Sequence, residues 1–405
     1  MSKAPKLRFK EFSGDWESDR LSKVCDINPK TSQIPDEFYY IDLESVVKGE
    51  LIKENIITKS EAPSRAQRVL SQGDTLFQTV RPYQNNNYYF SKERDLSTVA
   101  STGYAQLRSY TNSEFLYHLI YTSRFGKNVL LRCTGSNYPA INTTDLSEIE
   151  IYYPSKEEQD KIASFLSLID DKISLQGEKL ELLKDYKSGM MQKIFSMELR
   201  FKDDEGRDYP EWEEKKLNQL GDTYTGLSGK TKENFGIGEC KYVIYKNVFG
   251  NTIAKEDEVE LVEINEGESQ NKVIKGDLLF TTSSETPEEV GMVSCWNYDV
   301  EDLYLNSFCF GYRLFDLEQY SPIFIAYLLR SESYRRKISI LGQGSTRYNI
   351  SKNELMKMKI KVPVIEEQRK IVSLLLGIES KIEKEQEKLD SLNEYKKGLL
   401  QQMFV

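Results

Sequence analysis

The segment Pro154-Ser-Lys-Glu-Glu-Gln-Asp-Lys-Ile162 returns as Pro363-Val-Ile-Glu-Glu-Gln-Arg-Lys-Ile371, a shift of 209 residues from Pro154 to Pro363. The match continues without a gap through Leu166 and Leu375, Ile169 and Ile378, Ile173 and Ile382, Leu180 and Leu389, Leu183 and Leu392, Tyr186 and Tyr395, and Gly189 and Gly398. Similarity at one fixed spacing is the mark of a repeated structural unit. The sequence of 405 residues therefore contains two copies of one pattern.

Weaker echoes extend each copy toward its beginning. The matching pairs are Gly73-Asp-Thr-Leu-Phe77 with Gly276-Asp-Leu-Leu-Phe280, Phe115–Leu119 with Phe324–Leu328, and Leu7-Arg-Phe-Lys10 with Leu199-Arg-Phe-Lys202. The two Leu-Arg-Phe-Lys segments are followed by Trp16-Glu17 and Trp212-Glu213, respectively. This order predicts a globule over residues 1–153, a long helix over 154–200, a second globule over 201–362 and a second long helix over 363–405. At about 100–200 residues per domain, the length accommodates both globules.

The repeated helix carries apolar residues in alternating steps of three and four, which is the seam of a coiled coil. The expected seam residues are Ile162, Leu166, Ile169, Ile173, Leu180 and Leu183 in the first copy, and Ile371, Leu375, Ile378, Ile382, Leu389 and Leu392 in the second. Polar residues interrupt both seams at equivalent places, namely Gln176 and Lys187, then Glu385 and Lys396. A helix of roughly 40 residues is about 60 Å long. Ser155 with Glu158 predicts a capping box at the start of the first helix.

An isolated stripe of this kind more often indicates a bundle core or a homodimer. Two matched stripes in one chain favour packing of the two helices against each other. The chain must leave the first helix at its far end, pass through the second globule and return, so the pair is predicted to be antiparallel.

Both globules mix predicted strands with short helices. The strands are expected at Tyr39–Leu43, Asp74–Gln78, Tyr242–Tyr245 and Asp277–Thr281, and the helices at Glu114–Tyr121 and Pro322–Leu329. Strand and helix do not alternate as in a parallel α/β sheet, so the predicted class is α+β. The whole is expected to be two tandem α+β globules joined by two long antiparallel coiled-coil helices, with an internal pseudo-twofold repeat.

The composition limits the chemistry. The chain has a single histidine, His118, so histidine metal clusters and Ser-His-Asp catalysis are poor candidates. Its five cysteines form no Cys-x-x-Cys pair and predict reduced thiols rather than disulfides or a zinc site. The sequence has neither an apolar leader nor a run of about 18 apolar residues, so we expect a cytoplasmic protein without a membrane partner. We expect no catalytic and no metal-binding residues in this chain.

The net charge of −9 argues against a protein that coats nucleic acid nonspecifically, because such binding needs an excess of Lys and Arg. Residues 1–155 carry 19 basic and 19 acidic side chains, whereas residues 203–362 carry 20 and 28, so the excess acid lies mainly in the second globule. The basic residues nevertheless cluster. Arg and Asn or Gln are the side chains that read base edges, and Ser, Thr and Lys contact phosphates.

Polar and basic residues occur at corresponding places in the two copies, after a matched strand and before a matched helix. The candidate DNA-binding residues of the first globule are Arg81, Tyr83, Gln84, Asn85, Asn86, Arg124, Lys127, Ser136 and Asn137. Those of the second are Lys230, Lys246, Thr282, Ser283, Ser284, Arg336, Ser345, Arg347 and Asn349. Each cluster alone is more often a solvated surface. A repeated framework with unlike loops predicts two readers of two different targets.

One apparent nucleotide motif carries little weight. Gly226-Leu-Ser-Gly-Lys-Thr231 ends like a phosphate-binding loop, but that motif requires Gly at position 224, where this chain has Tyr224. A nucleotide-dependent enzyme that uses Lys230 would hydrolyse ATP as the isolated chain, and we expect no such activity.

Taken together, the duplicated Glu-Glu-Gln helix starts, the Tyr186-Lys-x-Gly189 and Tyr395-Lys-x-Gly398 segments and the repeated Leu-Arg-Phe…Trp-Glu segments resemble the specificity subunits of type I restriction-modification systems. The resemblance covers essentially the whole chain. It implies that each globule is a target recognition domain for one half of a bipartite double-stranded DNA sequence, and that the helices set the spacing of the halves. In that family the loop after the central strand and the loop before the helix face DNA. The resemblance therefore maps this role onto Arg81, Tyr83, Gln84, Asn85, Asn86, Ser136 and Asn137 in the first globule, and onto Thr282, Ser283, Ser284, Ser345, Arg347 and Asn349 in the second.

The resemblance also implies partners and their cofactors. Two methyltransferase subunits that carry S-adenosylmethionine would dock on the helices and globules, and two motor-nuclease subunits would use ATP and Mg. This chain itself would hold no cofactor. The alternative reading is a cytoplasmic coiled-coil scaffold whose two globules bind proteins.

Overall fold

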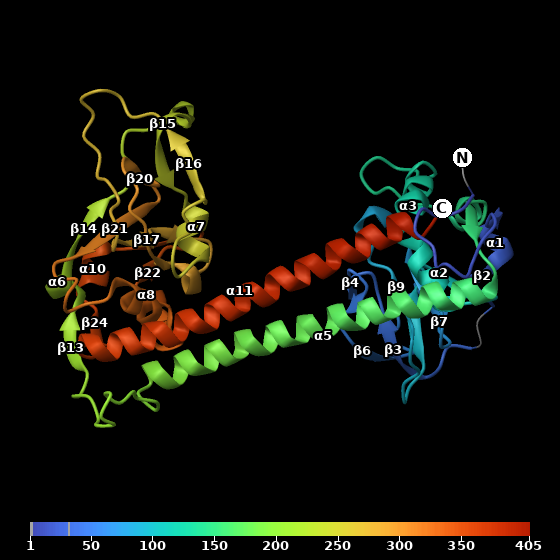
Figure 1. Cartoon of the computed structure of the whole chain (residues 1–405), viewed down its shortest axis with the longest axis horizontal. Helices are drawn as coiled ribbons and strands as arrows, with labels where there is room; N and C mark the ends of the chain where they lie inside the picture. Colours follow the sequence, from blue (N-terminus) through green and yellow to red (C-terminus); the bar gives the residue numbers. More distant parts are fainter. Residues whose placement is uncertain (1–2, 31–32) are drawn as a thin grey trace. The chain divides into compact units, whose positions relative to one another are not determined.

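The computed structural model describes residues 3–30 and 33–405. The chain forms two units, one of Met1–Lys179 with Glu385–Val405 and the other of Leu180–Lys384. The division falls within the two long helices, α5 (Lys156–Phe195) and α11 (Ile365–Gln402). Each unit therefore contains one globule and one end of each long helix (Figure 1).

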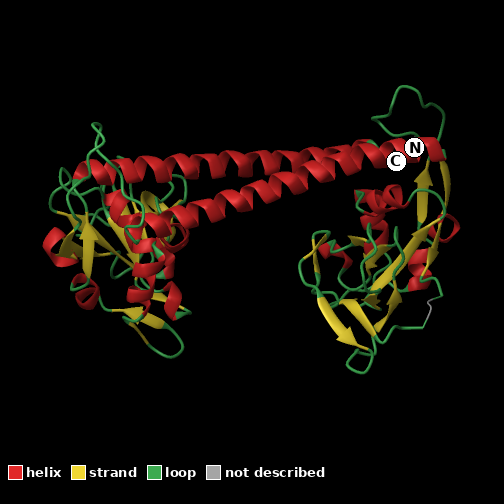
Figure 2. Ribbon diagram, turned by 90° about the horizontal axis from the view of Figure 1, so that it is seen from below, coloured by secondary structure: helices red, strands yellow, loops and turns green. Residues whose placement is uncertain are grey.

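Unit 1 contains two four-stranded sheets and short helices. Figure 2 shows that helices and strands are mixed in each globule. One sheet has the order β2 (Cys25–Ile27), β11 (Tyr104–Ser109), β8 (Thr75–Gln78), β9 (Tyr88–Tyr89), and the other β6 (Asn55–Thr58), β3 (Glu37–Ile41), β10 (Thr98–Ser101), β7 (Ala66–Val69). Two paired strands, β1 (Glu17–Arg20) and β12 (Glu150–Tyr153), link the start of the globule to its end. The helices are α1 (Leu21–Val24), α2 (Ser113–Ile120), α3 (Ser123–Leu130) and α4 (Thr143–Ser147).

Unit 2 repeats this plan. Its main sheet has the order β14 (Gly221–Thr225), β21 (Cys309–Leu314), β17 (Leu278–Thr281), β19 (Val293–Cys295), its second sheet β16 (Val259–Val262), β15 (Phe235–Val243), β20 (Leu303–Leu305), and β13 (Glu213–Lys216) pairs with β24 (Lys359–Val362). The helices are α6 (Leu217–Leu220), α7 (Tyr245–Gly250), α8 (Pro322–Arg330), α9 (Glu332–Ser339) and α10 (Lys352–Met356). The second sheet of each unit contains one parallel pair, β3 with β10 and β15 with β20. The predicted internal repeat and the α+β class are confirmed.

Most expected elements form, with three local differences. The strand predicted at Tyr39–Leu43 ends at Ile41. The strand predicted at Tyr242–Tyr245 ends at Val243, because helix α7 begins at Tyr245. The capping-box prediction for Glu158 is wrong, because its carboxylate accepts instead from Nε and Nη2 of Arg8, at 2.7 Å each.

Within each unit the two long helices run antiparallel. In unit 1, Gln176 Nε2 donates to the Glu385 carboxylate at 2.6 Å and to its backbone carbonyl at 2.9 Å, while Lys396 pairs with Asp170. In unit 2, Lys187 pairs with Glu379. Residue numbers on α11 thus rise as those on α5 fall. The interrupting side chains of the seam meet polar partners.

The structure buries half of the expected seam and partly buries the rest. The buried side chains are Ile162, Leu166, Leu180, Ile371, Leu375 and Ile378, and the partly buried ones are Ile169, Ile173, Leu183, Ile382, Leu389 and Leu392.

Each globule shares a core with its helix ends. In unit 1, Phe404 of the C-terminal segment stacks on Phe115 at a centroid distance of 5.2 Å and meets Trp16 edge-on at 6.1 Å. In unit 2 the equivalent residues are Phe195, Phe324 and Trp212, with Trp212 and Phe324 at 5.7 Å. Burial of such aromatic groups dominates core energetics, so these trios fasten the globules to the helices.

Candidate nucleic-acid interface

The two polar segments expected to cooperate in the first globule lie side by side. After strand β8 the chain reaches Arg81, whose backbone N–H donates to the Pro139 carbonyl at 2.7 Å. The Arg81 guanidinium carbon lies 4.3 Å from the centroid of the Tyr138 ring, a cation–π contact. Val80 also forms a β-bridge with Ala140. The segments 79–87 and 134–140 therefore form one surface.

The amides of the first segment divide into two groups. Gln84 Oε1 accepts from Gln78 Nε2 at 2.9 Å, and Asn86 Oδ1 accepts from the Lys48 N–H at 3.0 Å, so both shape the loop. Tyr83 is 53% exposed, and Asn85, with a left-handed backbone at φ 54°, is also exposed. Tyr83, Gln84 and Asn85 are thus all exposed, although Gln84 also accepts from Gln78, whereas Asn86 is half-buried and holds the backbone of Lys48.

The side chains of the second polar segment of unit 1 are exposed to solvent. Ser136, Asn137 and Tyr138 are all exposed. Gly135, just before them, has φ +92°, a left-handed conformation that glycine adopts without strain. Ser136 and Asn137 therefore lie on the same surface as Arg81, at the tip of the loop.

The second globule brings its two segments together through a small sheet. Strand β18 (Ser283–Ser284) pairs with β23 (Tyr348–Ile350), which pairs with β22 (Gly342–Gln343) on its other edge. Ser283 is opposite Asn349, and the Thr282 carbonyl accepts from the Ile350 N–H at 3.0 Å. Ser284 is mostly buried, and its hydroxyl donates to the Thr286 carbonyl.

Ser345 and Arg347 lie in the exposed turn between β22 and β23. Gly344 begins this turn at φ +138°, and an added Cβ would come within 2.0 Å of the Arg347 carbonyl oxygen. Only glycine fits there, so the backbone of this turn is closely defined. Thr282, Ser283, Asn349 and Arg347 thus share one surface.

Several basic candidates do not join these loops. The Lys230 side chain is 4% exposed and pairs with Glu268 at 2.5 Å, so it is not free to contact DNA or nucleotide phosphates in this structure. That ion pair, with hydrogen bonds from Gln270 and the Asn265 N–H, lowers the pKa of Glu268 to about 2. Arg336 pairs with Glu332 on the surface of α9. Lys127 and Lys246 are exposed.

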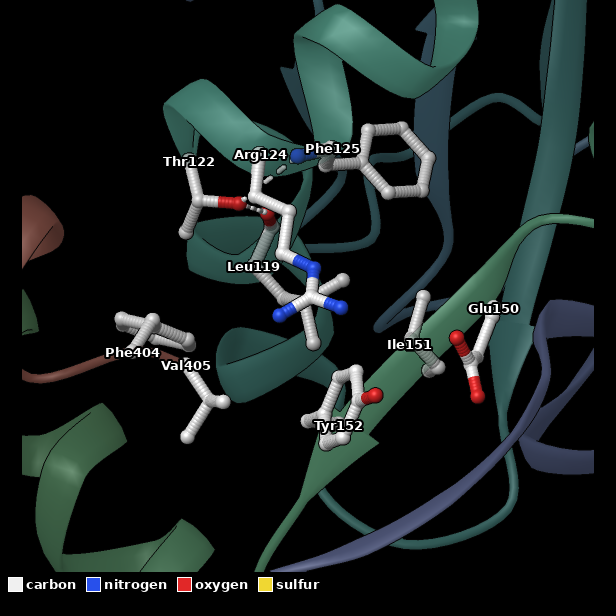
Figure 3. Close-up of a pocket in the computed structure, with 9 residues that line it drawn as sticks. All are labelled: Leu119, Thr122, Arg124, Phe125, Glu150, Ile151, Tyr152, Phe404 and Val405. Atoms are coloured by element: carbon white, nitrogen blue, oxygen red, sulfur yellow. Dashed lines mark hydrogen bonds between the residues drawn. The ribbon is translucent and has the colours of Figure 1, made fainter. Parts of the chain in front are cut away.

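Arg124 lines a separate, shallow surface hollow. Its guanidinium carbon is 4.2 Å from the centroid of the Tyr152 ring, and Leu119 and Phe404 also line the hollow (Figure 3). Arg124 belongs to the first turn of α3, whereas the Thr134–Ala140 bridge follows its last turn. A helix rises 1.5 Å per residue, which separates Arg124 from the loop surface by roughly 10 Å along α3.

The duplicated sequence motifs proved to be contacts at the junction of globule and helix, a role that sequence reasoning missed. Arg8 forms a bidentate ion pair with Glu158, and Arg200 forms one with Glu367, whose carboxylate is fully buried. Trp212 Nε1 also donates to Glu367, at 3.2 Å. The Leu-Arg-Phe segment of each copy therefore binds the Glu-Glu-Gln segment of the same copy. The repetition of both motifs together was the available signal.

A second duplicated ion pair lies in the sheets. Arg108 on β11 binds Asp74 through two hydrogen bonds of 2.8 Å, and Arg313 on β21 binds Asp277 in the same way. Both aspartates are fully buried. Each comes from a Gly-Asp pair that precedes the strand leading into the polar segment, so this ion pair fixes the start of that strand.

A third duplicated cluster connects each globule to both helices. In unit 2 the Tyr327 hydroxyl donates to Glu379 at 2.5 Å, and Lys187 pairs with the same carboxylate. In unit 1 the equivalent positions hold His118, Asp170 and Lys396, and the His118 ring nitrogen stays 3.9 Å from Asp170. In unit 2 the globule residue Tyr327 is therefore hydrogen-bonded to the helix carboxylate, whereas in unit 1 the equivalent residue His118 makes no hydrogen bond to Asp170.

The described residues 3–30 and 33–405 contain no group of three or more His, Cys, Asp or Glu side chains arranged to hold a metal ion. In the same part of the chain, no helix combines the length and the apolar character needed to span a membrane.

The sequence profile of the type I restriction modification DNA specificity domain matches this chain twice, over residues 13–185 and 209–394. The chain belongs to this family. The type I restriction enzyme MjaVIII specificity subunit of Methanocaldococcus jannaschii is 27% identical to it, over 97% of this chain and 94% of that protein.

Solved structures share the fold of this family member. A chain from a study of complex assembly and conformational transition of the type I R-M system superposes with a TM-score of 0.59 at 22% identity, over 96% of this chain and 97% of that one. The S subunit of a type I restriction-modification system from M. genitalium gives a TM-score of 0.58 at 15% identity, over 99% of each chain. The family resemblance expected from the duplicated motifs is confirmed.

Proposed function

We propose that this chain is the DNA sequence-specificity subunit of a type I restriction-modification complex and that each globule reads one half of a bipartite target. One observation supports this most strongly. Each of the two family matches contains a globule whose two polar segments, unlike in sequence between the copies, lie on one surface. Two related frameworks with different loops suit two different half-sites.

The proposed base-reading residues are exposed or half-buried side chains of these loops. In the first globule they are Arg81, Tyr83, Asn85, Ser136 and Asn137, and in the second Thr282, Ser283, Ser345, Arg347 and Asn349. Arg pairs well with guanine, and Asn with adenine, in the major groove. Lys127 and Lys246 are proposed to contact phosphates, which position the protein without reading sequence.

The proposed partners supply what this chain lacks. Two methyltransferase subunits with S-adenosylmethionine dock on the helices and globules and modify an adenine in each half-site, and two motor-nuclease subunits with ATP and Mg complete the complex. Methyltransferases at the DNA also add phosphate contacts, which offsets the net charge of −9. The chain itself is proposed to be non-catalytic and cytoplasmic.

The helical pair is proposed to set the distance between the half-sites. Its register is specified by polar contacts such as Gln176 with Glu385, because a polar side chain in a seam favours one alignment. Deletion of four residues from each helix, about one turn, is expected to shorten the gap or abolish activity. Modification of an unchanged sequence by that variant would contradict the spacer role.

The decisive experiment expresses the chain with its methyltransferase and maps methylated adenines across a genome. We expect a bipartite motif with a fixed gap. Absence of methylation with every cognate methyltransferase would refute the proposal. The alternative, a scaffold that binds proteins through both globules, predicts neither copurification with a methyltransferase nor sequence-dependent DNA binding.

A further inference from the structure

Two exposed aliphatic side chains stand out on the globules. Leu131 is 82% exposed and Ile340 is 81% exposed, the highest values among the large hydrophobic side chains in the described part of the chain. They are related by the same shift of 209 residues that relates the long helices. Single exposed hydrophobic residues are common on protein surfaces. Here, however, the two most exposed hydrophobic side chains occupy equivalent positions in a duplicated fold. This regularity needs a cause.

Both side chains are held firmly. Leu131 is the C-cap residue that follows α3, and its N–H donates to the Lys127 carbonyl at 3.1 Å. Ile340 is the C-cap residue that follows α9, with a helical backbone at φ −64°. Each helix buries two large side chains in its globule, Phe125 with Val129 in α3 and Tyr334 with Ile338 in α9. The aliphatic groups therefore project from a fixed backbone.

The surroundings of these side chains are polar and cationic. Leu131 precedes the exposed segment Thr134–Tyr138, and Ile340 precedes the exposed segment Gln343–Arg347. Lys127 lies one helical turn before Leu131, and Arg336 lies one turn before Ile340. A protein interface has a core depleted of charge and rich in apolar residues. Leu130, next to Leu131, is also exposed, at 48%, but the apolar group remains small. A small aliphatic group beside cations and hydroxyls suits a base step of DNA better.

We propose that Leu131 and Ile340 are wedges that insert between neighbouring bases of their respective half-sites when DNA binds. This inference rests on the proposed function. Proteins that distort DNA use Leu and Ile in this way, because unstacking a base step costs free energy that the inserted side chain offsets. An adenine inside a duplex must leave the stack before it can be methylated. A side chain that fills the opened step stabilises the distorted duplex, so each globule supplies both the reading loops and the wedge.

The test uses the full chain bound to its methyltransferase and duplexes that carry its mapped target. Leu131→Ser is expected to weaken binding of the fully paired duplex by about tenfold or more. A mismatch at the methylated adenine of one half-site removes most of the unstacking cost in advance, so it restores most of the lost affinity. Ile340→Ser is expected to behave in the same way, with rescue only by a mismatch in the other half-site.

Matched controls are Ile52→Ser in the first globule and Phe315→Ser in the second, which remove large side chains that are 62% and 69% exposed. Both controls are expected to bind paired DNA like the wild type. The wedge is refuted if Leu131→Ser and Ile340→Ser bind like the controls, or if they lose the same affinity on paired and mismatched DNA. Weaker copurification with the methyltransferase would also overturn it, because the side chains would then be docking contacts. If the wild type yields no bipartite motif, the proposed function itself fails.

Discussion

Replacement of His118 by Gln is expected to remove a loss of stability that the wild-type chain suffers as the pH falls from 7 to 5. His118 is the single histidine of the chain, and its side chain is 1% exposed. Neither ring nitrogen has a hydrogen-bond partner in the described structure. Burial first, and the Lys396 ammonium second, lower the pKa of His118 from 6.5 to about 3.

The sign of the effect comes from proton binding. Below about pH 6.5 the unfolded chain protonates this imidazole, whereas the folded chain keeps it neutral down to about pH 3. The unfolded state then binds more protons, so the unfolding free energy falls as the pH falls through this window. At 1.36 kcal/mol per pKa unit, the loss at pH 5 is about 2 kcal/mol. Burial raises the pKa of Asp170, and this shift changes the stability with pH in the opposite direction.

Urea denaturation at pH 7, 6 and 5 measures the effect as a difference between the wild type and His118→Gln. Proteolysis at each urea concentration, read by peptide mass, assigns the transition to unit 1, because two units need not unfold together. His118→Tyr is a second variant, since Tyr327 occupies the equivalent place in unit 2. Parallel stability curves for the wild type and both variants would show that the buried, neutral imidazole does not have this role.

Three further changes test other parts of the structure. Glu367→Gln leaves a buried ion pair unmade and is expected to lower the unfolding free energy by about 3 kcal/mol in urea denaturation, whereas the exposed neighbour Glu366→Gln changes it by less than about 0.5 kcal/mol. A hydrogen bond from Gln176, followed by those from two lysines, lowers the pKa of Glu385 to about 2. The ionised carboxylate therefore stabilises the fold, and this contribution is lost as the pH falls from about 4.5 to 2. Thermal unfolding of Glu385→Gln should lack this pH dependence. Lys230→Met should leave the methylated motif unchanged in genome mapping, and a changed motif would return Lys230 to the DNA surface.

The repeat and the long helices could be predicted because their signals are periodic in the sequence. The shift of 209 residues and the steps of three and four are visible without knowledge of distant contacts. Strands such as β8 and β17 were predictable for the same reason, since an apolar run next to a Gly-Asp turn is a local pattern. That the two polar segments of each globule act together could be predicted only because they recur at equivalent positions in the two copies.

The charged side chains could not be placed from the sequence. Lys230 and Arg81 are both basic residues near a turn, yet one is buried against Glu268 and the other stacks on Tyr138 at the surface. The difference depends on residues distant in sequence, about 40 and 60 positions away. Arg124 was grouped with the loop residues by its charge, but the opposite end of α3 carries it.

The features that the two copies share differ in kind from those in which they diverge. The shared ones are bidentate ion pairs and buried aromatic groups that join each globule to its helix ends, such as Arg8 with Glu158 and Arg200 with Glu367. These side chains bind one another and do not present hydrogen-bonding groups to the bases of DNA. The divergent ones are the exposed loop residues, an Arg–Tyr stack in one copy and a Ser–Asn strand pair in the other. Because loop residues contribute little to these junctions, a change of target needs no change in how the globule is held.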